Sequence, residues 1–446
     1  MNYLLARSQI WLVLSVVLFS CGGWVYMQRV LIAHQVSEAA AHGRPRGNLS
    51  DLYPRWIGAR ELLLHGRNPY SEEVTREIQA GYYGRPVDPS RPNDPHDKVG
   101  FAYPVYIAFF LAPTVGLPFP IVQRSFFLLL LVLTGASTIL WFRVLRWSLP
   151  PWTQVSLLAL MLSSIAVIQG LLLQQISLLV AGMMTVAIAL IIVDQQVAAG
   201  ILLAAATIKP QLVLLLLTWL LIWTWGDWRH RYRWVVSYAL SMTILVGLGE
   251  WYLPHWISLF WRAVRDYQNY TGAASVLDNL TGTPWNWISE IAALIAILAA
   301  CWKERRNSAD TGSFAFTVSM VLATTVLLVP ISAQYNQVLL IPAMLLLIKE
   351  RRTIWRTSLT NRILMVMTTA LIAWQWFASS ALAVLSYVLR PETLDRVWAA
   401  PIWTTLQTPV AVTALMLFHY YQATFDTPVA SARRRMLGNQ PPAQEP

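Results

Sequence analysis

Charged residues and cysteines are scarce in this sequence, and each scarcity excludes a class of protein. Only 12% of the 446 residues are Asp, Glu, Lys or Arg, whereas 56% are hydrophobic. A soluble domain of this length would carry about twice that charge. Apolar runs repeatedly reach the roughly 20 residues needed to cross a bilayer. The sequence therefore predicts an all-α, multi-pass membrane protein.

Residues that hold metals or make disulfides are also few. Cys21 and Cys301 both lie in or beside apolar runs, which argues against a disulfide framework and against a thiolate metal site. The seven histidines are scattered singly, and no P-loop, GxGxxG or HExxH motif occurs. We therefore predict no cofactor and no metal-binding residue, with a divalent cation held by loop carboxylates left as an open alternative.

Basic residues outnumber acidic ones, and their placement indicates a membrane rather than nucleic acid. The net charge is +11, yet residues 34–100 hold nine basic and nine acidic side chains and are neutral. The excess gathers in short clusters that flank apolar runs, at 229–233, 303–306, 349–352 and 433–435. This is the positive-inside pattern, so these clusters are predicted to lie in the cytoplasm, and no nucleic-acid partner is expected.

The apolar runs predict about twelve membrane spans, within a range of eleven to thirteen, and cytoplasmic termini. The predicted order is a first span at 1–33, an outer loop at 34–100, spans two to seven at 101–254, a second outer loop at 255–283, spans eight to twelve at 284–421, and a disordered cytoplasmic tail at 422–446.

One part of this topology breaks the charge rule. Counting each apolar run as one span places Arg143, Arg146 and the short polar stretch 194–196 outside. Reading 101–142 as one re-entrant unit would return the two arginines to the inside, but it would turn the cluster at 229–233 outward. We therefore retain twelve spans as the expectation.

The most informative polar segment is 48–70, which opens the first outer loop. Juxtamembrane helices are predicted at about 51–65 and 72–80, with Ser50 as the N-cap of the first and Gly66 at its end. Asp51 would then be a carboxylate at a helix start, and it is a candidate general base. Two other interpretations stay open: Asp51 could only cap the helix, or it could pair with Arg55 four residues later.

A lysine stands within one of the apolar runs. Lys209 precedes Pro210, which weakens a helix, so it is predicted to line a polar cavity at a broken helix. It would either snorkel to an interface or hold a lipid phosphate. Arg262 and Arg265 in the second outer loop are the other candidate cations.

Ordered motifs along the chain carry a family resemblance. They are Asp51 with Ala59-Arg60 and Asn68-Pro69-Tyr70, then Phe101-Ala102-Tyr103-Pro104, Gln174-Gln175-Ile176-Ser177, Ile208-Lys209-Pro210-Gln211, Asp278-Asn279-Leu280-Thr281-Gly282 and Ser332-Ala333-Gln334-Tyr335-Asn336. This pattern resembles glycosyltransferase family 87, polytopic enzymes of the GT-C fold that use polyprenyl-phosphate sugars, typically of mannose. It departs from that pattern at Val105, where a second proline is common, and at 333–336, where some members have Pro, Trp and His.

The resemblance implies a function and roles for single residues. It implies an enzyme in the bacterial inner membrane that moves a hexose, typically mannose, from a polyprenyl-phosphate sugar to a glycolipid, glycan or protein hydroxyl on the outer face. Asp51 would be the catalytic base, and Lys209, Arg262 and Arg265 would bind the donor phosphate. The candidates for substrate binding are Arg55, Arg60, Tyr103, Gln174, Asn279, Gln334, Tyr335 and Asn336. A lipid or solute transporter remains the alternative, although only one Lys-Pro break is found where paired broken helices are expected.

Overall fold

The computed structural model describes residues 2–45, 47, 50–88 and 90–437, and within them the chain forms helices, turns and loops without a β-strand. This confirms the predicted all-α class. The helices are α1 (Asn2–Tyr26), η1 (Met27–Leu31), α2 (Ile32–Ala41), α3 (Tyr53–His65), α4 (Glu72–Tyr83), α5 (Ile107–Leu111), η2 (Ala112–Thr114), α6 (Phe119–Val144), α7 (Pro151–Leu162), α8 (Ile165–Leu172), α9 (Ile176–Ile192), α10 (Gln196–Ala206), α11 (Pro210–Gly226), α12 (Trp228–Tyr252), α13 (Trp256–Thr271), α14 (Val276–Thr281), α15 (Trp285–Glu304), α16 (Gly312–Leu328), η3 (Gln334–Leu340), α17 (Ile341–Thr357), α18 (Leu359–Leu385), α19 (Pro391–Val397), η4 (Ala400–Ile402) and α20 (Gln407–Leu437).

Several of these helices are suited to a bilayer. Among the described residues, six stretches are long and apolar enough to cross a membrane, and the pair α7 and α8, bent by 61°, adds a seventh if it forms one span. The helices α9, α10, α11 and α16 are apolar but shorter. The chain is thus a multi-pass membrane protein, while the count of about twelve spans and the GT-C arrangement stay predictions.

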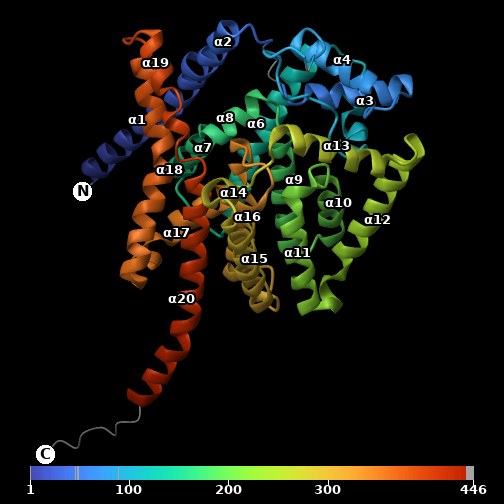
Figure 1. Ribbon diagram of the computed structural model, residues 1–446. Helices are drawn as coiled ribbons and strands as arrows, with labels where there is room; N and C mark the ends of the chain where they lie inside the picture. The colour runs from blue at the N-terminus through green and yellow to red at the C-terminus, as the bar shows by residue number, and fades with distance from the viewer. Residues whose placement is uncertain (1, 46, 48–49, 89, 438–446) are drawn as a thin grey trace, which may run out of the picture.

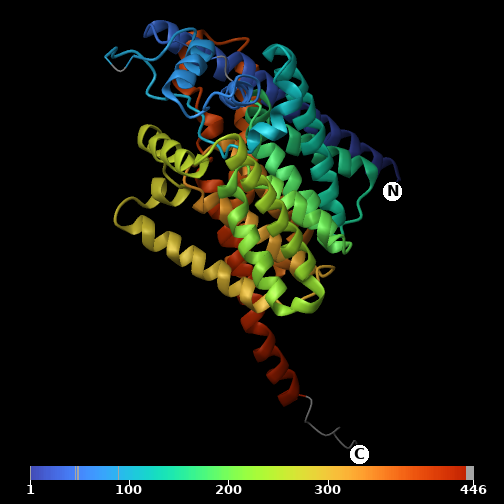
Figure 2. The ribbon, with the colours of Figure 1, turned by 90° about the vertical axis from the view of Figure 1, so that its right-hand side faces the viewer.

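The helix bundle has two chemically different ends. At the lower end in Figure 1, Arg231 donates to the backbone carbonyls of Arg305 at 2.8 Å and Asn307 at 3.0 Å. Lys349 donates to the carbonyl of Leu145 at 2.9 Å. The clusters at 229–233, 303–306 and 349–352 therefore share this end, called the basic end below, and α20 projects from it (Figures 1 and 2). The opposite end carries α3 and α4 and is called the cap end.

The structure has no full-length span at 101–117, so that prediction is wrong. The segment forms only the five-residue helix α5 and the short η2. Trp56 of α3 donates to a backbone carbonyl of η2 at 3.1 Å, which keeps the segment at the cap end. As a result α6 runs to the basic end, where Arg146 pairs with Asp310 at 3.5 Å. Arg143 and Arg146 were predicted to lie on the side opposite the basic clusters. They lie instead at the same end as those clusters.

The run 197–225 is also not one span, because it breaks at 207–209 into α10 and α11. Gln196, at the start of α10, donates to the carbonyl of His230 at 2.7 Å. The start of α10 and the end of α11 therefore both lie at the basic end. Lys209 lies at the turn where they meet. The stretch 194–196 therefore lies at the same end as the cluster at 229–233, and not at the opposite end as predicted. Pro210 supplies the reason for the break, since it has no N–H with which to continue a helix.

The buried interior centres on α16, which is buried on nearly every face. Four of its buried hydroxyls form hydrogen bonds to the backbone of the same helix. Thr317, Ser319, Thr324 and Thr325 each donate to the backbone carbonyl four residues earlier, at 2.8–2.9 Å. Such bonding lets polar residues sit in an apolar interior at little cost. The chain leaves α16 toward η3, which carries three of the predicted site residues, Gln334, Tyr335 and Asn336.

The two cap helices form close to where they were predicted, with different boundaries. Gly66 ends α3 in the left-handed conformation, with φ of 65°, and Ser71 caps α4 by accepting from the Val74 N–H at 3.2 Å. Ser50, however, is not the N-cap of α3. The helix begins at Tyr53, and its N-cap position is taken by Leu52, which makes no side-chain cap bond.

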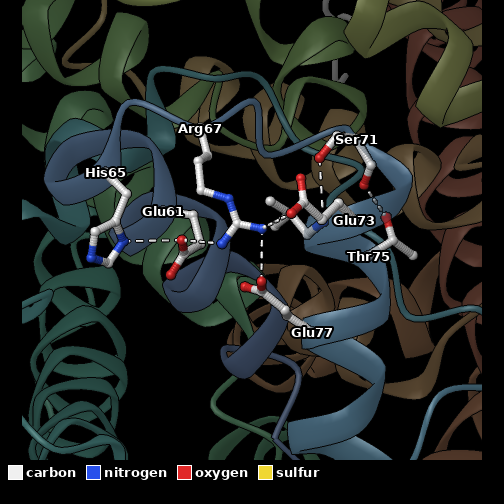
Figure 3. Close-up of polar contacts among 8 residues, drawn as sticks. Glu61, His65, Arg67, Ser71, Glu73, Thr75 and Glu77 are labelled. Atoms are coloured by element: carbon white, nitrogen blue, oxygen red, sulfur yellow. Dashed lines mark hydrogen bonds and ion pairs between the residues drawn. The ribbon is translucent and has the colours of Figure 1, made fainter.

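An ionic network holds α3 against α4, as Figure 3 shows. Arg67 contacts the carboxylates of Glu61 at 2.9 Å, Glu73 at 3.2 Å and Glu77 at 2.7 Å. Exposed pairs contribute only about 0–1 kcal/mol each. Glu61 is buried, so the network mainly fixes the turn between the two helices. The network thereby fixes α3 relative to α4.

Two predictions concern the ends of the described ranges. The disordered tail predicted from 422 is wrong over its first part, since α20 continues to Leu437, and the remainder at 438–446 lies outside the described residues. Asn48, which opens the predicted polar segment, lies outside them as well.

Candidate active site

Asp51 lies in a turn just before α3 and does not cap it. Its backbone N–H donates to the carbonyl of Leu173, after α8, at 2.8 Å. Its carboxylate accepts a short hydrogen bond from the side-chain amide of Gln175. The predicted position at a helix start was therefore wrong by two residues. Asp51 is instead held against the turn between α8 and α9, partly exposed.

Arg55 does not neutralise the Asp51 carboxylate. Its Nη1 donates to the Asp51 backbone carbonyl at 2.6 Å, and its guanidinium lies over the ring of Tyr103 at 4.4 Å. In the described part of the chain no ion pair joins Arg55 to a carboxylate, and its buried Nε has no hydrogen-bond partner. The carboxylate thus keeps its capacity to accept a proton, and a cation with spare donors lies beside it.

Lys209 is a buried cation without a counterion. Its Nζ donates to Ser177 Oγ at 2.6 Å, and lies 3.4 Å from both Gln175 Oε1 and Asn336 Oδ1. The ring of Tyr335 lies 4.9 Å away. No carboxylate pairs with it among the described residues. A buried, uncompensated ammonium is costly, and such a group provides a ready site for an anion.

Gln175 links the carboxylate to the ammonium. Its amide nitrogen donates to Asp51 while its amide oxygen accepts from Lys209, so the two contacts together define the orientation of the amide. Neither Gln175 nor Ser177 was among the predicted site residues. The signal was in the Gln174-Gln175-Ile176-Ser177 motif, but the sequence could not distinguish the two adjacent glutamines.

The surroundings raise the pKa of Asp51 above its ordinary value. Burial is the main cause, and the charge of Asp97 adds to it. The positive charges of Arg55 and Lys209 and the hydrogen bond from Gln175 oppose this rise. A carboxylate with a raised pKa is a stronger base than an exposed one and is still ionised near neutral pH when the rise is moderate.

Several predicted residues gather around this pair. Tyr335 and Asn336 contact Lys209, and Tyr103 lies under Arg55. Gln174 is adjacent but faces elsewhere: its backbone has a positive φ of 47°, and its side chain bonds to Ser50 at 2.7 Å and to carbonyls at the end of α8. Gln174 therefore anchors the turn that presents Gln175.

Five predicted residues lie apart from the pair, and none of them bonds to Asp51, Gln175 or Lys209 in the described part of the chain. They are Arg60 on α3, Asn279 on α14, Gln334 at the start of η3, and Arg262 and Arg265 on α13. The guanidinium of Arg60 lies over the ring of Trp56 at 5.5 Å. Asn279 and Gln334 bond to Ser332 at 3.1 Å and Thr405 at 3.3 Å. Both arginines of α13 are exposed.

Metal-binding side chains do not cluster in the described residues: no group of three or more His, Cys, Asp or Glu could hold an ion there. At the site itself Asp51 supplies a carboxylate, Arg55 and Lys209 supply cations, and Gln175 and Ser177 supply amide and hydroxyl dipoles. This combination can remove a proton from a hydroxyl and stabilise a negative charge nearby.

Comparison with known proteins supplies the family. A family model described as glycosyltransferase family 87 matches residues 101–330, just over half of the chain. The matched range includes Gln175, Ser177 and Lys209, while Asp51 and Asn336 lie on either side of it. No curated protein and no solved structure matches the chain. The chain belongs to glycosyltransferase family 87 and is a membrane glycosyltransferase.

Proposed function

We propose that the protein transfers a hexose, typically mannose, from a polyprenyl-phosphate sugar to an acceptor hydroxyl, with Asp51 as general base. The observation that carries this proposal is that Gln175 bridges the Asp51 carboxylate and the buried Lys209 ammonium, neither of which forms a direct ion pair in the described part of the chain. Family membership supports the sugar transfer. The lipid-phosphate donor and mannose rest on the resemblance described above.

The proposed reaction begins with deprotonation of the acceptor. Asp51 takes the hydroxyl proton as the acceptor oxygen attacks the anomeric carbon, and the bond from that carbon to the phosphate oxygen breaks. The polyprenyl phosphate leaves with the bonding electrons. General-base assistance of this kind contributes about 10²–10⁴ in rate. The raised pKa of Asp51 favours the proton transfer.

The leaving phosphate gains negative charge, and cations must stabilise it. Lys209 is the first candidate because it has no carboxylate partner. Arg55 is the second, since its Nε is unpartnered and it lies beside Asp51. Arg262 and Arg265, the cations predicted from sequence, are replaced in this role by Arg55. Fixed cations and dipoles of this kind contribute about 10²–10³ in rate each.

We place the reaction on the outer face of a bacterial inner membrane. The support is the separation of the two ends: the basic clusters gather opposite the cap end, where Asp51 lies, and such clusters favour the cytoplasmic side. A lipid-linked donor in the outer leaflet would reach Asp51 without crossing the membrane. The transporter alternative loses its basis, because the chain belongs to a glycosyltransferase family.

The decisive experiment measures transfer or hydrolysis of radiolabelled polyprenyl-phosphate sugars by the purified protein. Wild type should consume one donor, and Asp51→Asn should lose about 10²–10⁴ of that rate while remaining folded. Asp97→Asn, assayed at a pH above the titration range of Asp51, is the matched control, because it removes a nearby carboxylate that influences the pKa of Asp51 but does not contact Gln175. Full activity of Asp51→Asn would remove Asp51 as the base, and consumption of no donor by wild type would refute the proposed donor class.

A further inference from the structure

An open pocket lies at the cap end, and Asp51 is not among the residues that line it. This cavity has a volume of about 420 Å³ and is lined mainly by α4, residues 98–102 and α13. Cavities that bind small molecules measure about 300–1,000 Å³. The cavity is therefore large enough to receive a ligand, and the reaction steps above do not use it.

Charged side chains of both signs line this cavity. Glu72 and Arg76 pair with each other at 3.4 Å, whereas Lys98, Arg262 and Asp266 form no ion pair within 4.0 Å in the described part of the chain. Tyr70 and Tyr270 also line the wall. A sugar hydroxyl both donates and accepts hydrogen bonds, so neighbouring donors and acceptors can bind it together. Lys98 and Arg262 supply donors here, and Asp266 supplies an acceptor.

Two tyrosines of the cavity wall connect it to the catalytic pair. Tyr70 donates to the backbone carbonyl of Tyr103 at 2.6 Å, and the ring of Tyr103 faces the guanidinium of Arg55. The ring of Tyr270 meets the ring of Tyr267 at 5.4 Å, and Tyr267 lies close enough to Asp51 for the two to interact electrostatically. The cavity therefore neighbours the catalytic pair, with Tyr103 and Tyr267 between them.

We propose that this cavity binds the sugar portion of the acceptor, a neutral oligosaccharide, and so directs its terminal hydroxyl toward Asp51. This inference rests on the proposed function for the direction of the acceptor, but glycan binding itself can be measured without the reaction. It also gives Arg262 a role that differs from the one predicted from sequence.

Other parts of the substrates fit the cavity less well. A polyprenyl chain would bury the charged groups of Lys98 and Asp266 against hydrocarbon, which is unfavourable. A donor phosphate would meet the carboxylates of Glu72 and Asp266, which also line the wall. Neutral hydroxyls satisfy both signs of charge at once.

The test measures binding of the purified full-length protein to immobilised neutral hexose oligosaccharides. The same glycans are presented on a hydrophilic spacer and on a lipid anchor in vesicles. Binding to both would identify a glycan recognised alone, and binding only to the lipid form would identify a glycolipid head group. Wild type should bind in at least one form. Asp266→Asn and Arg262→Gln should each weaken binding about tenfold or more.

The matched control is Arg265→Gln, which removes an exposed charge from the same helix outside the cavity and should bind as wild type. Asp51→Asn should bind glycan normally although it cannot perform the proposed transfer, which separates the two proposals. Absence of binding by wild type, or equal binding by wild type, Asp266→Asn and Arg262→Gln, would overturn the inference while leaving the donor assay unaffected.

Discussion

Replacement of Lys209 by methionine separates a phosphate-binding lysine from a structural one. In the wild type its ammonium is buried, lacks a counterion and makes one short hydrogen bond, to Ser177 at 2.6 Å, with weaker ones at 3.4 Å to Gln175 and Asn336. A hydrogen bond from a charged group contributes about 1.5–3 kcal/mol. Burial of the charge costs several kcal/mol.

These contributions nearly cancel, so Lys209→Met should change the free energy of unfolding by only about 1 kcal/mol in either direction. Methionine has a similar length and no charge to desolvate. The rate should respond very differently. Loss of a fixed cation beside the leaving phosphate should lower kcat by about 10²–10³, equivalent to about 2.7–4 kcal/mol.

The assay combines thermal unfolding with transfer kinetics on the donor that wild type consumes. Lys303→Met, at an exposed lysine of the basic end, is the control and should retain both properties. The reasoning fails if Lys209→Met keeps wild-type kcat. It also fails if the activity loss follows the loss of folded protein, because Lys209 would then serve only to support Ser177 and Asn336.

The remaining predictions concern the base and its support. The rate should rise with pH, because the base must be ionised, and the midpoint should lie above the ordinary aspartate pKa of about 3.9. In a pH–rate profile Gln175→Leu should move this midpoint upward and Asp97→Asn should move it downward, since the first removes a contact that lowers the pKa and the second a charge that raises it; an unmoved midpoint in both would contradict the assignment. Gly58→Ala should lower stability by about 1–3 kcal/mol, because a Cβ there would lie 2.2 Å from the ring of Phe101. Gly116→Ala, with no atom within 4 Å of its added Cβ, is the control in thermal unfolding, and equal midpoints would refute the packing account.

Periodicity and composition were enough to predict the elements. The all-α class, the cap helices α3 and α4, the helix end at Gly66 and the break before Pro210 all follow from local signals, because caps, glycine conformations and proline act within a few residues. Span topology did not follow. Hydropathy detects an apolar run but not whether it forms one long helix or two short ones that turn back on each other, as α10 and α11 do.

The site was predicted in part. Asp51, Lys209, Tyr103, Tyr335 and Asn336 were chosen on motif order, and the structure brings them together. Arg262 and Arg265 were chosen on charge and location in an outer loop, which did not determine the direction in which α13 would present them. The choice between two adjacent glutamines depended on a single backbone φ, which the sequence leaves open.

The sequence by itself determined that this protein is a helical membrane protein with one carboxylate and one lysine in unusual positions. Only the tertiary structure decided how these two groups relate. Asp51 and Arg55 are four residues apart, and helical spacing alone allows an ion pair. Because the chain before α3 is drawn toward the end of α8, Arg55 bonds to the Asp51 backbone and Gln175 binds the carboxylate instead. The charge of Asp51 thus stays available for catalysis through contacts between segments more than 100 residues apart in the chain.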